Sequence, residues 1–301
     1  MTDYALTSMG PMHQVDFGGS GPDLVLVHGL GGSTTNWNAV GPGLARTARV
    51  RAIDLPGFGL TPPRGNFRLN THRDSIVAYL ETLDSSNTTL IGNSSGGLLS
   101  ELVAAARPDL VHRLILVSPA TPPVFPDPQL DWPTVIRLSV QATPFIGEVY
   151  GRHFLRSNTP EELVQKSLAM ITHKPGRVPM GLIADSRDMA HIRKQLPWAG
   201  YATARTATSI ARLYLRRTAY LSMIRSIVAP TLVVQGVSDH IVSPGAVDWM
   251  CAVRPDWEQV RMEDTGHTPQ MDAPLRFLAV VEDWLARTGP KVAEGDPAPV
   301  A

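Results

Sequence analysis

Two adjacent serines stand between glycines in the stretch Gly92-Asn93-Ser94-Ser95-Gly96, directly after an apolar run. The pattern G-x-S-x-G fits in one register only, because centring it on Ser95 would require a glycine where Asn93 stands. A nucleophile on a sharp strand-to-helix turn is held in a strained conformation, and its neighbours two residues away must lack bulk. Ser94 is therefore the candidate nucleophile, and the Ser95 N–H is a candidate donor to an oxyanion. Considered without the rest of the chain, this stretch could also be a flexible loop after a strand.

A second glycine-rich stretch, His28-Gly29-Leu30-Gly31-Gly32, also follows an apolar run. A loop of this kind could cradle a phosphate, but Thr34 stands at the third glycine position of G-x-G-x-x-G, and G-x-x-x-x-G-K-[ST] is absent. We interpret the stretch as an oxyanion loop, in which the Leu30 N–H would act together with that of Ser95. His28 is interpreted as a structural residue that holds the loop.

A serine hydroxyl is a weak nucleophile at its ordinary pKa and needs a base. Of the nine histidines, His267 lies in a loop beyond the last apolar run, where it can reach Ser94 at the same edge of a sheet. Asp239 follows the preceding apolar run and is the predicted orienting carboxylate. Asp264 is nearer to His267 in sequence, but a separation of three residues across a turn is more typical of loop capping. The order Ser94, Asp239, His267 is that expected of nucleophile, acid and base on such a turn.

Apolar runs rich in Val, Ile and Leu alternate with helical patterns, which predicts an α/β fold with a mostly parallel sheet flanked by helices. Strands are expected over Leu24–His28, Val50–Asp54, Thr88–Ile91, Leu114–Val117, Thr231–Gln235 and Gln259–Met262, with His13–Phe17 in an edge hairpin. Helices are expected over Asn70–Leu83, Ser95–Ala106, Pro244–Val253 and Pro274–Ala286. These elements would carry the candidate residues at the carboxyl ends of the strands.

The alternation of strands and helices stops after Val117 and resumes at Pro230. Between them, Thr159-Pro160-Glu161-Glu162 has the composition of a helix start, and Ser209–Ile224 has a helical pattern. We expect one α/β domain interrupted by a helical insertion rather than two sequential domains. The predicted division is residues 1–118 and 230–288 for the α/β core, 119–229 for a helical cap, and 289–301 for a disordered tail.

As a set, these motifs resemble the α/β-hydrolase superfamily. The resemblance covers roughly residues 12–118 and 230–287 and rests on His28-Gly29, Asp54-Leu55-Pro56-Gly57-Phe58-Gly59, Gly92-x-Ser94-x-Gly96-Gly97, Asp239 and Gly266-His267. It implies Ser94 as nucleophile, His267 as base and Asp239 as acid, with the Leu30 and Ser95 N–H groups as oxyanion hole. It also implies that the helical insertion covers the pocket. Thr61, where relatives often carry serine, is a small departure.

Ser94, at the centre of the G-x-S-x-G turn, limits the reactions that the chain could catalyse. Haloalkane dehalogenases and epoxide hydrolases of this fold attack with aspartate, so Ser94 argues against both. A Ser-His-Asp set suits acyl transfer to water through an acyl-enzyme. The first hypothesis is hydrolysis of carboxylic esters of neutral, moderately apolar acyl groups. The alternatives are C–C bond hydrolysis of ring-fission diketones and, from another class, a small-molecule receptor with little turnover.

The expected cap offers side chains for an apolar acyl pocket, although packing between its helices accounts for most of them. They are Trp132, Phe145, Tyr150, Phe154, Met170, Met180, Met189, Trp198 and Tyr214. Trp132, Phe145 and Trp198 are the candidates for substrate contact. The arginines at 212, 216, 217 and 225 are interpreted as a solvated helix face, with attraction of an anionic substrate or a membrane surface as the alternative. The glycine-rich loop itself places the apolar Leu30 at the reaction centre.

The composition, 43% hydrophobic and 18% charged, is that of an ordinary soluble globular protein. Because 27 basic residues balance 27 acidic ones, a small-molecule substrate is expected rather than nucleic acid. The single cysteine, Cys251, excludes an internal disulfide and a CxxC site. Without a signal-peptide pattern or an apolar run of about 18 residues, we expect a cytoplasmic protein with no membrane span. Neither a metal nor an organic cofactor is expected, and the oligomeric state is not predicted.

Overall fold

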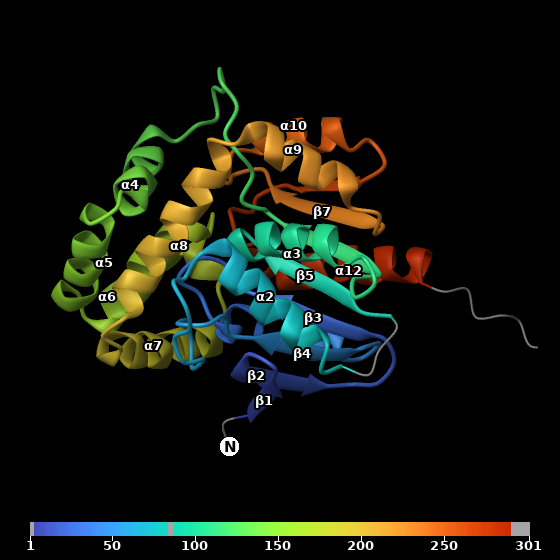
Figure 1. Ribbon diagram of the computed structural model, residues 1–301, viewed down its shortest axis with the longest axis horizontal. Helices are drawn as coiled ribbons and strands as arrows, with labels where there is room; N and C mark the ends of the chain where they lie inside the picture. Colours follow the sequence, from blue (N-terminus) through green and yellow to red (C-terminus); the bar gives the residue numbers. More distant parts are fainter. Residues whose placement is uncertain (1–2, 84–86, 290–301) are drawn as a thin grey trace, which may run out of the picture.

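An eight-stranded sheet forms the centre of the described part of the chain, residues 3–83 and 87–289 of a computed structural model (Figure 1). Its strands are β1 (Asp3–Thr7), β2 (Gly10–Gly18), β3 (Asp23–Val27), β4 (Arg49–Ile53), β5 (Thr89–Asn93), β6 (Arg113–Val117), β7 (Thr231–Gly236) and β8 (Glu258–Met262). They lie in the order β1-β2-β4-β3-β5-β6-β7-β8. The pairs β1–β2 and β2–β4 are antiparallel, and all other neighbours are parallel. The predicted mostly parallel α/β fold is confirmed.

Both faces of the sheet are covered, which explains why its central strands are nearly continuous apolar runs. In β3, Val25 and Val27 belong to the apolar cluster on one face, and Leu24 and Leu26 to that on the other. The first cluster includes side chains of α2 (Leu69–Leu80), α3 (Ser95–Ala106) and α10 (Pro244–Val253). The second includes side chains of η1 (Thr34–Trp37), α1 (Gly41–Leu44) and α12 (Pro274–Thr288). The short α11 (Pro269–Asp272) precedes α12.

The observed elements differ from the sequence predictions mainly at their ends. Helices α3 and α10 have the predicted bounds, while α2 ends three residues earlier than predicted and α12 two residues later. The hairpin partner β1 was not predicted, because its side chains are mostly exposed and carry no apolar pattern. The predicted helix over Ser209–Ile224 is in fact two helices, separated at Leu215 and Arg216. The predicted tail lies, apart from Gly289, outside the described residues.

Between β6 and β7 the chain forms helices only, and we call residues 119–229 the helical insertion. Its elements are α4 (Trp132–Ala142), α5 (Ile146–Ser157), α6 (Pro160–Ile171), η2 (Pro175–Arg177), α7 (Met180–Gln195), α8 (Ala199–Tyr214) and α9 (Arg217–Ser226). Thr159 and Glu162 form the predicted capping box of α6. Leu155, Leu163 and Leu182 belong to a buried apolar cluster formed largely by α5, α6 and α7. Across the described chain, no helix combines the length and apolar character needed to cross a membrane.

Candidate active site

Ser94 lies at the turn between β5 and α3, with φ 56° and ψ −121°. A positive φ is strained for a residue with a side chain, so the surrounding structure must hold it. The Ser94 N–H donates to the Val117 carbonyl at 2.9 Å, and the Ala120 N–H donates to the Ser94 carbonyl at 3.0 Å. These bonds fasten the turn to the end of β6 and the segment that follows it.

Close backbone contacts explain the glycines on both sides of Ser94. A Cβ on Gly96 would overlap the carbonyl oxygens of Val27 and His28, and a Cβ on Gly92 would overlap the Gly96 carbonyl. On the facing loop, a Cβ on Gly29 would lie 3.1 Å from the Ser94 Cβ. The glycine pattern therefore lets three backbone segments meet around one serine.

His267 and Asp239 form a buried hydrogen-bonded pair. The His267 Nδ1 and the Asp239 Oδ2 are 2.8 Å apart, and the two residues are 4% and 2% exposed. The Asp239 Oδ1 accepts the N–H groups of Ile241 and Val242 at 2.8 and 3.0 Å, and Gln235 donates to Oδ2 at 3.1 Å. The Asp239 oxygen beside Nδ1 favours the imidazole tautomer that carries its hydrogen on Nδ1. The Nε2 atom of His267 is then free to accept a proton.

Ser94, Ser95, Leu30 and His267 all line one cavity of about 890 Å³. Asn93, which sequence reasoning did not single out, joins two parts of this site. Its Nδ2 donates to the Val117 carbonyl at 3.0 Å and to the His267 carbonyl at 3.1 Å. The only sequence signal for this role is its place between Gly92 and Ser94.

His28 is fully buried beside the glycine-rich loop that follows it, and both its ring nitrogens form hydrogen bonds. Nε2 accepts the Leu55 N–H at 3.1 Å, so Nδ1 carries the hydrogen and donates to the Gly29 carbonyl at 2.7 Å. Burial lowers the pKa of His28, which keeps the ring neutral. These contacts agree with the structural role expected from the sequence.

Asp264 contacts the helical insertion, not its own loop. Its carboxylate lies 2.5 Å from the Lys174 Nζ and 2.7 Å from an Arg177 guanidinium nitrogen. Hydrogen bonds from these two cations lower the pKa of Asp264 to about 2. The expected loop cap is therefore wrong, because these longer-range ion pairs occupy the carboxylate.

Asp272 fastens the loop that carries His267 to the end of α6. Its buried carboxylate accepts the Gly266 N–H at 2.6 Å and the His173 N–H at 2.9 Å. The Thr268 N–H donates to the Ile171 carbonyl at 3.1 Å. The position of His267 is thus coupled to the helical insertion.

The three aromatic residues predicted for substrate contact do not line the cavity. Trp132 and Phe145 begin their helices on the solvent side, where they are 57% and 77% exposed, and Trp198 packs against the main core. Helical periodicity shows which residues share a face but not which face turns inward. Other side chains from the predicted apolar set do line the cavity: Tyr150, Phe154, Met170, Met189 and Tyr214.

Arg193 of α7 also lines the cavity and reaches the glycine-rich loop at Gly31, a contact that the sequence did not predict. Its guanidinium donates to the Gly31 carbonyl at 2.9 Å and to the Thr203 hydroxyl at 3.0 Å. Burial lowers its pKa to about 10, which leaves it charged at neutral pH. Among the described residues no carboxylate pairs with it. The described chain also contains no group of three or more His, Cys, Asp or Glu placed to hold a metal ion.

The chain is similar to several known proteins. Residues 22–274 match the family model described as alpha/beta hydrolase fold. The chain is 26% identical to a pimeloyl-[acyl-carrier protein] methyl ester esterase of Aeromonas hydrophila, covering 89% of this chain and 96% of that protein. It is 27% identical to a 2-hydroxymuconate semialdehyde hydrolase of Pseudomonas sp., covering 89% and 88%. A thermophilic esterase of Thermogutta terrifontis has a similar fold, with a TM-score of 0.72, 23% identity and coverage of 95% and 98%.

Proposed function

The chain belongs to the α/β-hydrolase family, and from that premise we propose that it is a serine hydrolase that cleaves carboxylic esters. The observation that carries the proposal is the buried pair of Asp239 and His267 beside the cavity that Ser94 also lines. The esterases among its relatives support the same reaction. In the same proposal the enzyme acts on small molecules in the cytoplasm.

In the proposed mechanism, His267 Nε2 takes the proton of Ser94 as its oxygen attacks the ester carbonyl. The Leu30 and Ser95 N–H groups donate to the oxyanion of the tetrahedral intermediate. His267 then returns the proton to the departing alcohol and leaves an acyl-enzyme. A water molecule, deprotonated by His267, releases the acid and restores Ser94. Asp239 holds the imidazole and stabilises its positive charge.

The helical insertion is proposed as a cap that supplies the acyl pocket. Tyr150, Phe154 and Met170 line the cavity from α5 and α6, and Met189 and Tyr214 line it from α7 and α8. Side chains of this kind suit a moderately apolar acyl group. Cavity walls drawn from four helices would make the cap, and not the sheet, determine acyl chain length.

Arg193 favours a second candidate reaction, C–C bond hydrolysis of a ring-fission diketone. Such a substrate carries a carboxylate and an enol, and a half-buried guanidinium without a carboxylate partner can bind that anion. The 2-hydroxymuconate semialdehyde hydrolase among the relatives is consistent with this reading. A neutral ester has no carboxylate for Arg193 to bind.

Comparing kcat/KM for p-nitrophenyl butyrate, p-nitrophenyl octanoate and a ring-fission diketone tests the proposal. Arg193→Gln is measured beside the unmodified chain. We expect the esters to be preferred and to change little in the variant. A diketone preferred more than about tenfold, or 1.4 kcal/mol in the transition state, with that preference lost in Arg193→Gln, would establish the second candidate. Ligand binding without turnover of either class would indicate a receptor.

A further inference from the structure

Large apolar side chains are exposed along the outer margin of the helical insertion. They lie on α4, at the start of α5 and in the loop before α4; α4 and α5 stand on the side of the molecule away from the sheet, and the loop extends outward between α4 and α9 (Figure 1). We call the set the apolar edge, and its members are between 57% and 77% exposed: Phe125, Trp132, Ile136, Phe145, Ile146 and Val149. Exposed apolar patches of this kind commonly mark sites of interaction with proteins or membranes.

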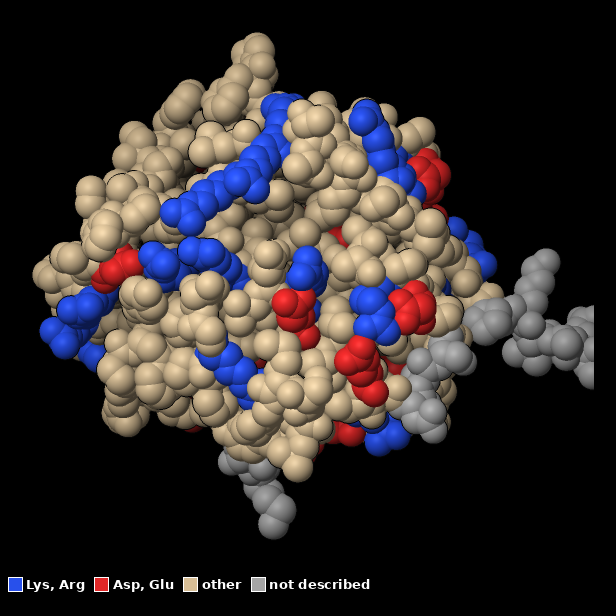
Figure 2. Space-filling view, viewed as in Figure 1, with Lys and Arg blue, Asp and Glu red and all other residues tan. Residues whose placement is uncertain are grey.

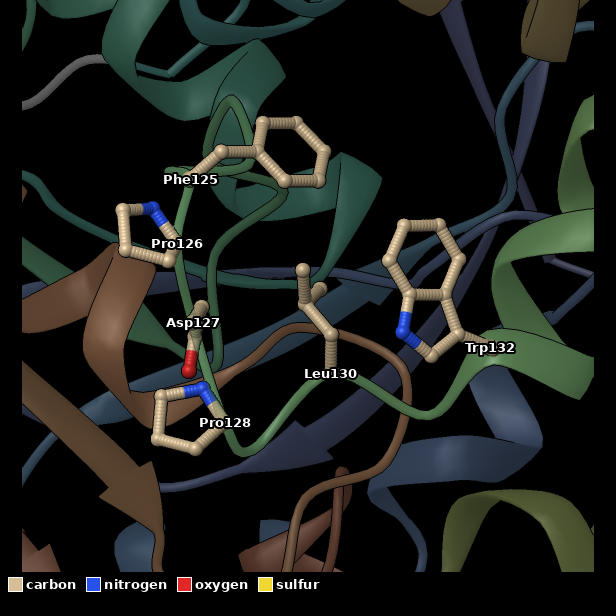
Figure 3. A pocket seen from close by; sticks show the side chains of 6 residues that line it. All are labelled: Phe125, Pro126, Asp127, Pro128, Leu130 and Trp132. Carbon is tan, nitrogen blue, oxygen red and sulfur yellow. The ribbon is translucent and has the colours of Figure 1, made fainter.

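One part of the apolar edge forms a hollow beside the candidate active site (Figure 3). Phe125 and Trp132 stack with ring centroids 6.3 Å apart, and Pro126, Pro128 and Leu130 complete the apolar lining. Leu130 also lines the cavity that contains Ser94. The exposed hollow and the catalytic cavity therefore share a wall.

Helix α5 combines apolar and basic side chains on one exposed face. Val149, Arg152 and Arg156 follow the spacing i, i+3 and i+7 within α5, Phe145 lies directly before the first residue of the helix, and all four are exposed. Within the described chain, neither arginine is paired with a carboxylate. The face is apolar where α5 begins and positively charged where it ends.

The helical insertion as a whole carries a net positive charge. Residues 119–229 contain 14 Lys or Arg against seven Asp or Glu, while the remaining chain contains 13 against 20. Figure 2 shows blue side chains gathering over the insertion half of one face, whereas red and blue alternate over the sheet half. The segment that carries the apolar edge, residues 119–157, is itself neutral, with Arg137, Arg152 and Arg156 against Asp127, Asp131 and Glu148. Because Glu148 pairs with Arg205, Arg152 and Arg156 remain as the cations of α5 beside the edge.

We propose that the apolar edge docks on the surface of an anionic phospholipid bilayer. Phe125 and Trp132 would lie at the boundary between headgroups and acyl chains, where aromatic side chains are favoured. Arg152 and Arg156 would lie near the phosphates of the lipid headgroups, because the negative surface of an anionic leaflet attracts basic side chains. If the proposed ester hydrolysis is correct, an ester dissolved in the bilayer would enter the cavity beside Leu130.

Flotation with vesicles of phosphatidylcholine, with and without phosphatidylglycerol, tests the docking at about 0.1 M salt, where the Debye length is about 10 Å. The Ser94→Ala variant is used throughout, so binding is measured apart from any hydrolysis. We expect binding to the anionic vesicles that weakens as salt is added. The double variants Trp132→Ser/Ile136→Ser and Arg152→Gln/Arg156→Gln should each bind on the order of tenfold more weakly. Leu275→Ser, at a site 80% exposed on α12, is the matched control and should bind normally.

Two further measurements decide what occupies the edge. Quenching of tryptophan fluorescence by brominated lipid should occur in the starting protein and disappear in Trp132→Phe, which keeps the apolar ring. Equal binding by the edge variants and Leu275→Ser, at unchanged melting temperature, would overturn the proposal. So would an absence of binding to anionic vesicles. A concentration-dependent dimer that Trp132→Ser/Ile136→Ser abolishes would instead identify a second copy as the occupant.

Discussion

Ser94 and Ser95 have the same side chain but different backbone conformations, since Ser94 has a positive φ and Ser95 begins α3. We expect Ser94→Ala to lose on the order of 10⁶ in kcat, as removal of a triad nucleophile does elsewhere. Ser95→Ala should keep most activity, because its backbone N–H remains. Hydrolysis of p-nitrophenyl butyrate measures both, and peptide mapping after fluorophosphonate labelling locates the acylated residue. A label on Ser95 would contradict the assignment.

Asp239 and Asp264 are two carboxylates with different partners, which allows a matched comparison. Asp239→Asn should lower kcat roughly 10⁴-fold near neutral pH, because the amide favours the wrong tautomer of His267. Asp264→Asn should leave kcat nearly unchanged, since Asp264 pairs with Lys174 and Arg177. The two variants are compared by kcat and by melting temperature. Equal loss of activity at unchanged melting temperature would show that Asp264 acts on His267.

At the scale of elements, the contact of α3 with β3 and the loop that follows it depends on Gly96. A Cβ there would meet the carbonyls of Val27 and His28, which are backbone atoms that cannot rotate away. We expect Gly96→Ala to destabilise the fold by about 1–3 kcal/mol or more. Gly181→Ala, in the first turn of α7 with open space around it, is the control and should stabilise by up to about 1 kcal/mol. Urea unfolding of both variants measures the difference, and equal effects would contradict the close approach.

The contact between the His267 loop and α6 predicts a coupled loss of stability and activity. Asp272→Asn removes the charge that accepts the Gly266 and His173 N–H groups. Hydrogen bonds to charged groups contribute about 1.5–3 kcal/mol, so the free energy of unfolding should fall by about that amount. A displaced His267 should lower kcat by about tenfold to hundredfold while KM changes little. A lower melting temperature with unchanged kcat would show that Asp272 serves stability alone.

At the scale of the whole molecule, Glu101 links stability to pH. It is fully buried in α3, and burial raises its pKa to about 8, although the nearby Tyr220 hydroxyl favours the charged form. Between pH 4.5 and 8 the folded state therefore holds a proton that the unfolded state has lost, so stability falls as pH rises through this range. Glu101→Gln does not titrate at this position. Its stability relative to the unmodified protein should increase from pH 5 to pH 8, by at most about 1.4 kcal/mol per pH unit.

Urea unfolding at pH 5, 6.5 and 8 measures the linkage on the whole chain. The matched comparison is Asp264→Asn, whose carboxylate has a pKa lowered to about 2 by Lys174 and Arg177. The stability from that carboxylate is present above its ordinary pKa of 3.8 and is lost as pH falls toward 2. Asp264→Asn should therefore show a constant difference from pH 5 to pH 8. A constant difference for Glu101→Gln as well would mean that Glu101 is ionised in the folded protein.

Much of this molecule follows from its sequence alone. The central strands, α3, α10 and the glycines around Ser94 were predictable because each depends on residues within one turn or one strand. A buried parallel strand must be apolar on both faces, and a strained serine needs small neighbours, whatever the rest of the chain does. The insertion was visible for the same reason, since the strand pattern stops at Val117 and returns at Pro230.

The partners of individual side chains were decided only by the tertiary structure. Chain order pointed to Asp239, but its separation of 2.8 Å from His267 exists only because the ends of β7 and β8 lie side by side. Arg193 reaches Gly31, 162 positions away, while Trp132 and Phe145 face solvent. A helical pattern identifies the face a residue shares but not the rotation of that face in the packed molecule. That rotation is set by the fit of whole helices against one another, which no single segment of the sequence contains.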